Sequence, residues 1–189
     1  MTIDDMIDPA VGYIILNGFD AAGRQKIRNA LVELYGEPDG SGGFIGGSAT
    51  FRALFSPVVS GVVPLNIDFA SNAASAEVGG FQVYIDSDSE RVQVTDFGQV
   101  VNTGLAAVLC HELVHAVGGA NDVLNPLANP DVSANPDYLG NCDWFTNLIL
   151  LDLGLEPAST YNSKLRVNGG SHAFLRSGET SRTGMLISS

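Results

Sequence analysis

The segment His111-Glu112-Leu113-Val114-His115 combines residue types that could bind a metal ion and use it in catalysis. If this segment is helical, His111 and His115 emerge from one face of the helix, about one turn apart. Two imidazoles at that spacing can reach one zinc ion at ~2.0–2.1 Å. Glu112 is rotated by roughly 100° from His111, so it would lie beside the metal. From there its carboxylate could take a proton from a zinc-bound water and hand it to a leaving amine.

The residues around this segment favour a metal site over a surface helix that happens to carry two histidines. Apolar side chains surround the polar trio, which predicts a largely buried helix; these are Leu109, Leu113, Val114 and Val117. Buried polar groups need partners, and a metal ion is the natural partner for two histidines. We therefore predict one bound Zn²⁺.

A catalytic zinc ion needs a third protein ligand and one open position. Gly118-Gly119 would let the chain reverse after the helix, and Asp122 is the first carboxylate after that reversal. We predict Asp122 as the third ligand. The alternatives are Asp143, Asp137, the remaining histidine His172, or a water molecule in place of a third protein ligand.

The segment from Cys110 to Asp122, CHELVHAVGGAND, resembles the zinc-binding segment of effector-type metalloproteases, the NleC- and NleD-like families of the aspzincin kind. The similarity continues through Thr146-Asn147 and residues 151–157 to Tyr161. It implies that the ligands are His111, His115 and Asp122 and that Glu112 is the general base. It also implies that Tyr161 is a further ligand or a donor to the oxyanion of the reaction. The alternative for Tyr161 is a packing role at a helix end.

Hydrophobic periodicity predicts the elements that position these residues. Helices are expected over 103–117 and 141–153, with a long irregular loop between them. Upstream, we expect a strand over 12–16, a helix that begins after Asp20 and ends near Gly36, and a strand over 62–69. The runs 81–85 and 91–95 alternate around a polar turn, which predicts a β-hairpin. Its edge strand could bind an extended peptide by adding it to the sheet.

Together these elements predict an α+β fold, and the resemblance implies that it is of the zincin type. In this fold a mixed β-sheet with an edge hairpin packs on the active-site helix and on a second helix. A chain of 189 residues fits a single metallopeptidase domain, residues 1–189. Within it, residues 1–100 would form a lobe of strands and a helix, 101–161 the zinc-binding helical part, and 162–189 a C-terminal tail.

Composition narrows the range of partners. The net charge of −12 argues against nucleic-acid binding, because like charges repel phosphate backbones. No apolar run approaches the ~20 residues that a membrane helix needs. The first eight residues are acidic where a secretory signal would be basic. We expect a monomer that acts on a protein or peptide, either in the cytoplasm or after secretion by a signal-independent, effector-type route.

Two cysteines flank the predicted site, Cys110 before the first histidine and Cys142 in the second predicted helix. Reduced packing thiols are the default for a reducing compartment, and a disulfide tying the two helices is the alternative. Cys110 is not expected to be a ligand, because its helical position points it away from the face shared by the histidines.

The sequence therefore predicts a zinc-dependent endopeptidase that hydrolyses peptide bonds. One alternative is a catalytically inactive binding protein of zincin fold with a structural metal, and another is a metalloenzyme that hydrolyses other amides. The presence of Glu112 favours an enzyme, because a structural site has no use for this carboxylate.

Overall fold

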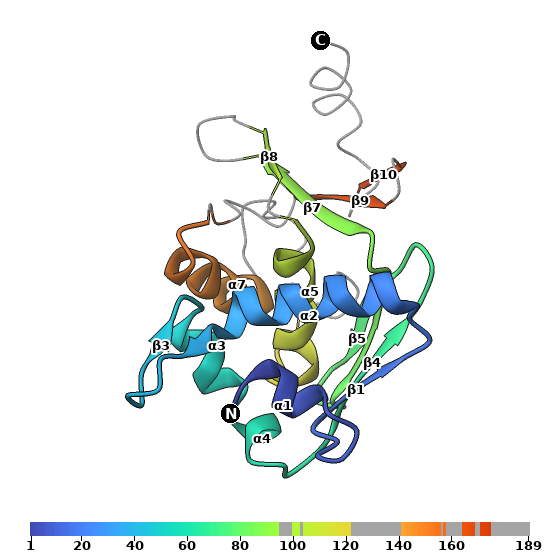
Figure 1. The fold of residues 1–189 in the computed structure, drawn as a ribbon. Coiled ribbons are helices and arrows are strands. Elements are labelled where there is room, and N and C mark those ends of the chain that lie inside the picture. The colour runs from blue at the N-terminus through green and yellow to red at the C-terminus, as the bar shows by residue number, and fades with distance from the viewer. Residues whose placement is uncertain are drawn as a thin grey trace.

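The computed structural model describes residues 1–94, 100–102, 104–121, 141–155, 157, 164–168 and 171–174 (Figure 1). Its helices are α1 (Ile3–Ile7), α2 (Ala21–Tyr35), α3 (Ala49–Leu54), α4 (Ser56–Val59), α5 (Gly104–Ala116) and α7 (Asn141–Asp152). Its strands are β1 (Ile14–Asn17), β2 (Glu37–Pro38), β3 (Phe44–Ile45), β4 (Leu65–Phe69), β5 (Ala74–Glu77), β6 (Gln82–Ile85), β7 (Ser89–Val94), β8 (Val100–Asn102), β9 (Lys164–Asn168) and β10 (Ser171–Phe174). The fold is mixed α/β.

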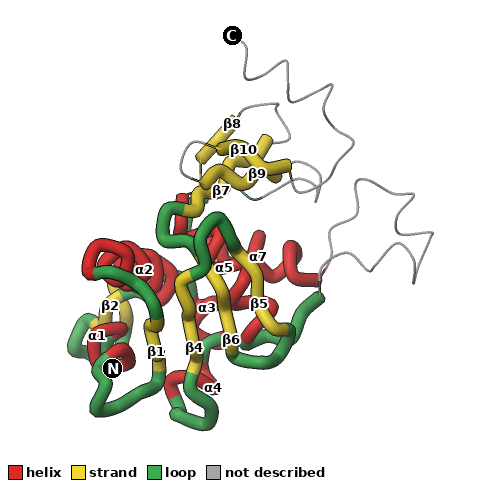
Figure 2. The backbone as a smooth tube through the Cα atoms, turned by 90° about the vertical axis from the view of Figure 1, so that its right-hand side faces the viewer, coloured by secondary structure: helices red, strands yellow, loops and turns green. Residues whose placement is uncertain are grey.

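The main sheet has the strand order β1-β4-β6-β5. Strands β1, β4 and β6 run parallel, and β5 pairs antiparallel with β6, so the predicted mixed sheet is confirmed. Figure 2 shows α5 and α7 behind this sheet. Side chains that alternate along the parallel strands form one buried face; they are Ile14, Leu16, Leu65, Ile67, Val83 and Ile85. Helices therefore cover this apolar face, as the period of two along each strand requires.

Helix α2 confirms the helix predicted after Asp20. The Asp20 side chain caps it by accepting a hydrogen bond from the backbone N–H of Gly23 at 2.7 Å. The helix stops at Gly36, whose φ of 79° is a left-handed conformation that favours glycine. One face of α2 is buried and contains Ile27, Ala30, Leu31 and Leu34. This apolar face packs the helix against the centre of the molecule, where α2 contacts α5.

The predicted hairpin of residues 81–85 and 91–95 is wrong. Strand β6 lies in the main sheet, whereas β7 lies in a second, antiparallel sheet with the order β10-β9-β7-β8. The two sides of β6 are already occupied by β4 and β5, so β7 cannot pair with it. The chain turns after β6, where the N–H of Ser89 donates to the carbonyl of Asp86, and then enters the second sheet. The main sheet therefore ends in strand β5, which contacts α5, and the predicted edge hairpin is absent from this sheet.

Helices α5 and α7 confirm the two helices predicted around the metal-binding segment. Helix α5 contacts α2, α7, β5 and β7, so it occupies the middle of the fold. Its buried residues include Leu109, Leu113 and Val114, as expected for a largely buried helix. Within the described ranges, no helix combines the length and the hydropathy that crossing a membrane requires.

Candidate metal centre

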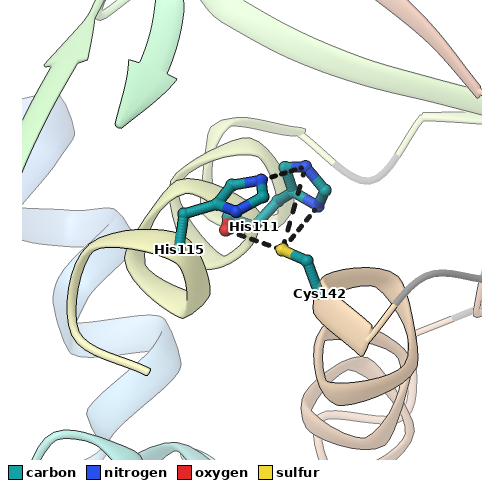
Figure 3. Close-up of side chains that lie close together, drawn as sticks. All are labelled: His111, His115 and Cys142. Carbon is teal, nitrogen blue, oxygen red and sulfur yellow. Dashed lines mark hydrogen bonds between the residues drawn. The ribbon is translucent and has the colours of Figure 1, made fainter. Parts of the chain in front are cut away.

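The two histidines of α5 face one another at the surface of the helix that meets α7 (Figure 3). Their Nε2 atoms are 3.2 Å apart, and the ring planes are nearly perpendicular, at 89°. His115 is 7% exposed and the side chain of His111 is 16% exposed. The spacing of one helical turn therefore brings the two rings together, as predicted.

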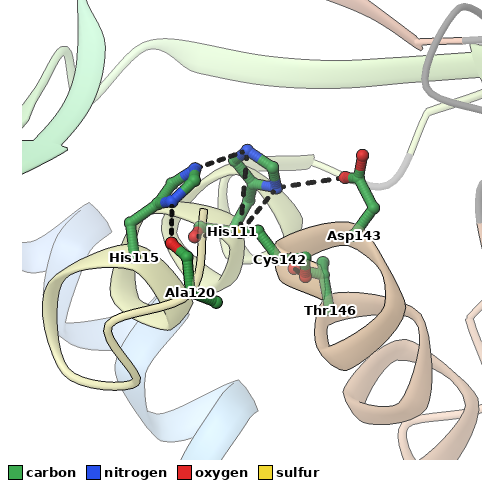
Figure 4. Close-up of polar contacts among 6 residues, drawn as sticks. All are labelled: His111, His115, Ala120, Cys142, Asp143 and Thr146. Carbon is green, nitrogen blue, oxygen red and sulfur yellow. Dashed lines mark hydrogen bonds and ion pairs between the residues drawn. The ribbon is translucent and has the colours of Figure 1, made fainter. Parts of the chain in front are cut away.

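The tautomer of His115 is fixed by the end of its own helix. Gly119 has a φ of 64° and turns the chain after α5, so that the carbonyl of Ala120 faces back toward the helix. This carbonyl lies 2.6 Å from Nδ1 of His115 (Figure 4). A carbonyl oxygen only accepts, so Nδ1 must carry the proton and Nε2 the lone pair. The chain reversal predicted at Gly118-Gly119 therefore orients a ring, a role that sequence analysis did not foresee.

His111 has a comparable contact on its own Nδ1 atom. Asp143, from the first turn of α7, places Oδ1 3.3 Å from this nitrogen and is fully buried. The distance is at the long end for an N–H donating to a carboxylate. With Nδ1 protonated toward Asp143, the lone pair of His111 lies on Nε2, the atom that faces His115. Asp143, an alternative third ligand in the sequence analysis, thus lies beside the nitrogen that faces away from His115.

If both Nδ1 atoms carry the ring protons, the two Nε2 atoms are both acceptors and lie 3.2 Å apart. Two acceptors at this distance repel unless a proton or a metal ion lies between them. Two nitrogens bound to one tetrahedral zinc at ~2.0–2.1 Å are about 3.3–3.4 Å apart. The arrangement of His111 and His115 therefore fits a zinc ion.

Cys142, the second residue of α7, contributes a third atom to this centre. Its Sγ lies 3.5 Å from Nδ1 and 4.0 Å from Nε2 of His111. The ligand atoms of His111, His115 and Cys142 all lie within 4.8 Å of one another, a group that could hold a metal ion. The sequence predicted a packing role for Cys142, because only the packing of α7 on α5 brings this residue to the histidines. Cys110 and Cys142 are both buried and form no disulfide with each other, so the disulfide considered as an alternative is absent.

Other polar residues are buried around the histidines. Glu112 is 7% exposed and follows His111 on α5. On α7, Asn147 is 9% exposed and Thr146 is fully buried, with its hydroxyl donating to the carbonyl of Cys142 at 2.8 Å. Buried polar side chains thus accompany the histidines on both α5 and α7, which is typical of a functional site.

Several predicted site residues lie outside the part of the chain that the structure describes. These are Asp122, Asp137 and Tyr161, and for His172 only the backbone, in β10, is described. The assignment of Asp122 as third ligand and the role of Tyr161 therefore stay predictions.

No family model matches this chain, and no curated protein sequence matches it. A solved structure to which the chain is similar belongs to the class of zinc metalloprotease effectors. That protein is GtgA of Salmonella, with 15% sequence identity and a TM-score of 0.47 over 79% of this chain and 80% of that chain. The resemblance to the NleC- and NleD-like families stays a prediction.

Proposed function

We propose that this protein is a zinc-dependent endopeptidase of zincin type in which His111 and His115 hold the metal. The observation that carries the proposal is the pair of Nε2 atoms 3.2 Å apart. Each ring is oriented through its other nitrogen, by the carbonyl of Ala120 for His115 and by Asp143 for His111. Metal-binding histidines characteristically have such partners, which fix the tautomer and the direction of the lone pair.

Glu112 acts as the general base in this proposal. Zinc, when bound, supplies a Lewis acid that polarises the scissile carbonyl and makes water a better nucleophile at neutral pH. The Glu112 carboxylate accepts a proton from the attacking water and delivers it to the leaving amine. Asp122 as third ligand and Tyr161 as a donor to the oxyanion complete the proposed site. A structural metal site has no use for Glu112, which favours an enzyme over an inactive binding protein of the same fold.

The substrate in this proposal is an extended segment of a protein or peptide. Strand β5 stands at one end of the main sheet and contacts α5, the helix that carries both histidines. A peptide that adds to the sheet beside residues 75–77 would gain backbone hydrogen bonds and run past the metal centre. In this proposal β5, and not the hairpin predicted from the sequence, is the edge strand that binds the peptide. The monomeric state and the effector-type route of secretion stay predictions.

The experiment that tests this function is cleavage of mixed proteins and peptides, read by mass spectrometry. The zinc-loaded protein should cleave internal peptide bonds, a chelator should abolish cleavage, and added zinc should restore it. Cleavage that persists after the metal has been removed would contradict the proposal. Tight binding of one zinc without cleavage of any substrate would instead favour the inactive binding protein.

A further inference from the structure

We propose that the thiolate of Cys142 is a ligand of the metal held by His111 and His115. This inference rests on the proposed zinc site and adds a residue that sequence analysis did not assign to it. Cys142 comes from α7, so the ligand set would join the two helices that meet at the centre (Figure 3). Zinc sites in proteins accept nitrogen and sulfur ligands together.

The distances already approach those of a shared metal ion. A sulfur at ~2.3 Å and a nitrogen at ~2.0–2.1 Å from one tetrahedral zinc are about 3.5–3.6 Å apart. The sulfur of Cys142 is 4.0 Å from Nε2 of His111, the nitrogen that faces His115, and 3.5 Å from Nδ1. To reach the separation of two zinc ligands, the sulfur has to approach Nε2 of His111 by about 0.4–0.5 Å. The ligand atoms of all three residues already lie within 4.8 Å of one another.

The surroundings of the sulfur favour a charged ligand there. Cys142 is fully buried and lies in the first turn of α7, where the helix dipole favours a negatively charged side chain. Asp143 is buried against His111, and Glu112 is buried on α5 next to His111 in the chain; buried charges are characteristically paired or bound to metal ions. A divalent cation would offset this accumulation of acidic groups.

Without a metal ion, the Cys142 thiol makes a hydrogen bond that is weaker than a bond to zinc. Its thiol donates to the backbone carbonyl of His111 across 3.4 Å, a contact that holds the sulfur against α5. On metal binding the S–H bond breaks, the proton goes to solvent and a sulfur–metal bond forms, with no change in oxidation state. In this ligand set the thiolate would take the third position, which the proposed function gives to Asp122, and would leave one tetrahedral position open for water or substrate.

Cys110 provides a matched control. It is also a buried cysteine outside any disulfide, and it lies directly before His111 on α5. Among the described residues, however, the group that could hold a metal contains Cys142 and not Cys110. The two cysteines therefore differ in position relative to the histidines and not in burial.

Cobalt(II) substitution tests the inference, because a thiolate bound to cobalt gives a charge-transfer absorption band in the near ultraviolet. We expect this band in the cobalt-loaded parent protein and in Cys110→Ala, and its loss in Cys142→Ala. The visible bands of bound cobalt should remain in Cys142→Ala, and its affinity for zinc should fall at least tenfold. If Cys142→Ala does not fold, as judged by circular dichroism, Cys142→Ser keeps the size of the side chain and should give the same result.

Two results would overturn the inference while the proposed function stands. One is a parent protein that binds cobalt but shows no charge-transfer band. The loss of cobalt binding in His111→Ala would show in this case that the histidines hold the metal. The other is a band that survives in Cys142→Ala. A parent protein that binds neither cobalt nor zinc would overturn the inference and the proposed function together.

Discussion

The contact between Asp143 and His111 should control how tightly zinc binds. Replacing Asp143 by asparagine keeps the shape of the side chain but removes its charge. Partners of this kind behind a metal-binding histidine typically change metal affinity by about 10- to 100-fold. The distance of 3.3 Å between Nδ1 and Oδ1 exceeds the usual N–H···O range, so we expect a loss near the lower limit. Tenfold corresponds to about 1.4 kcal/mol of binding free energy.

The assay is a zinc titration in competition with a chromogenic chelator at constant pH. Asp152→Asn is the matched control, because it makes the same chemical change at the other end of α7, where Asp152 contacts α3. The control should bind zinc like the parent. An unchanged zinc affinity in a folded Asp143→Asn variant would refute the orienting role. Complete loss of zinc would instead identify Asp143 as a ligand, the alternative left open by the sequence.

Three further changes have defined outcomes. Asp122→Ala should weaken zinc binding at least tenfold in the same competition titration if Asp122 is the third ligand; unchanged affinity would remove Asp122 from the ligand set and leave the third position to Cys142. Gly119→Ala should destabilise the fold by about 1–2 kcal/mol in urea denaturation, because its φ of 64° is left-handed, and should also weaken zinc binding by releasing His115. The Ser48 hydroxyl donates to Asp152 at 2.7 Å and lowers the pKa of that carboxyl. The resulting stability is present above pH ~4 and is lost as the pH falls through the lowered pKa. Asp152→Asn should therefore cost about 0.5 kcal/mol at pH 7, a small amount because the group is exposed, and nothing at the lowest pH.

Local sequence patterns predicted the parts of the site that depend on a single helix. The apolar positions around His111 and His115 were enough to place both rings on one face of α5, since helical geometry is set by neighbours in the chain. The cap at Asp20 and the stop at Gly36 likewise predicted α2.

Pairing between distant segments was not predictable in the same way. Alternation in 81–85 correctly predicted a strand, but it does not say which strands lie beside it, and β4 and β5 occupy both sides. Strand β5 was missed because the sequence Ala-Ser-Ala-Glu lacks the β-branched and aromatic residues that mark strands. Cys142 and Asp143 reach His111 only through the packing of α7 on α5, which periodicity does not specify.

The most direct test of the central claim is the turnover of Glu112→Gln measured at matched zinc occupancy. Glu112 lies beside the two proposed ligands on α5, so its replacement by an amide of the same shape should leave the metal in place. We expect one zinc bound per chain and a fall in peptide cleavage of about 10²- to 10⁴-fold, the usual contribution of general acid–base catalysis. Cleavage at the parent rate by the zinc-loaded variant would contradict the account.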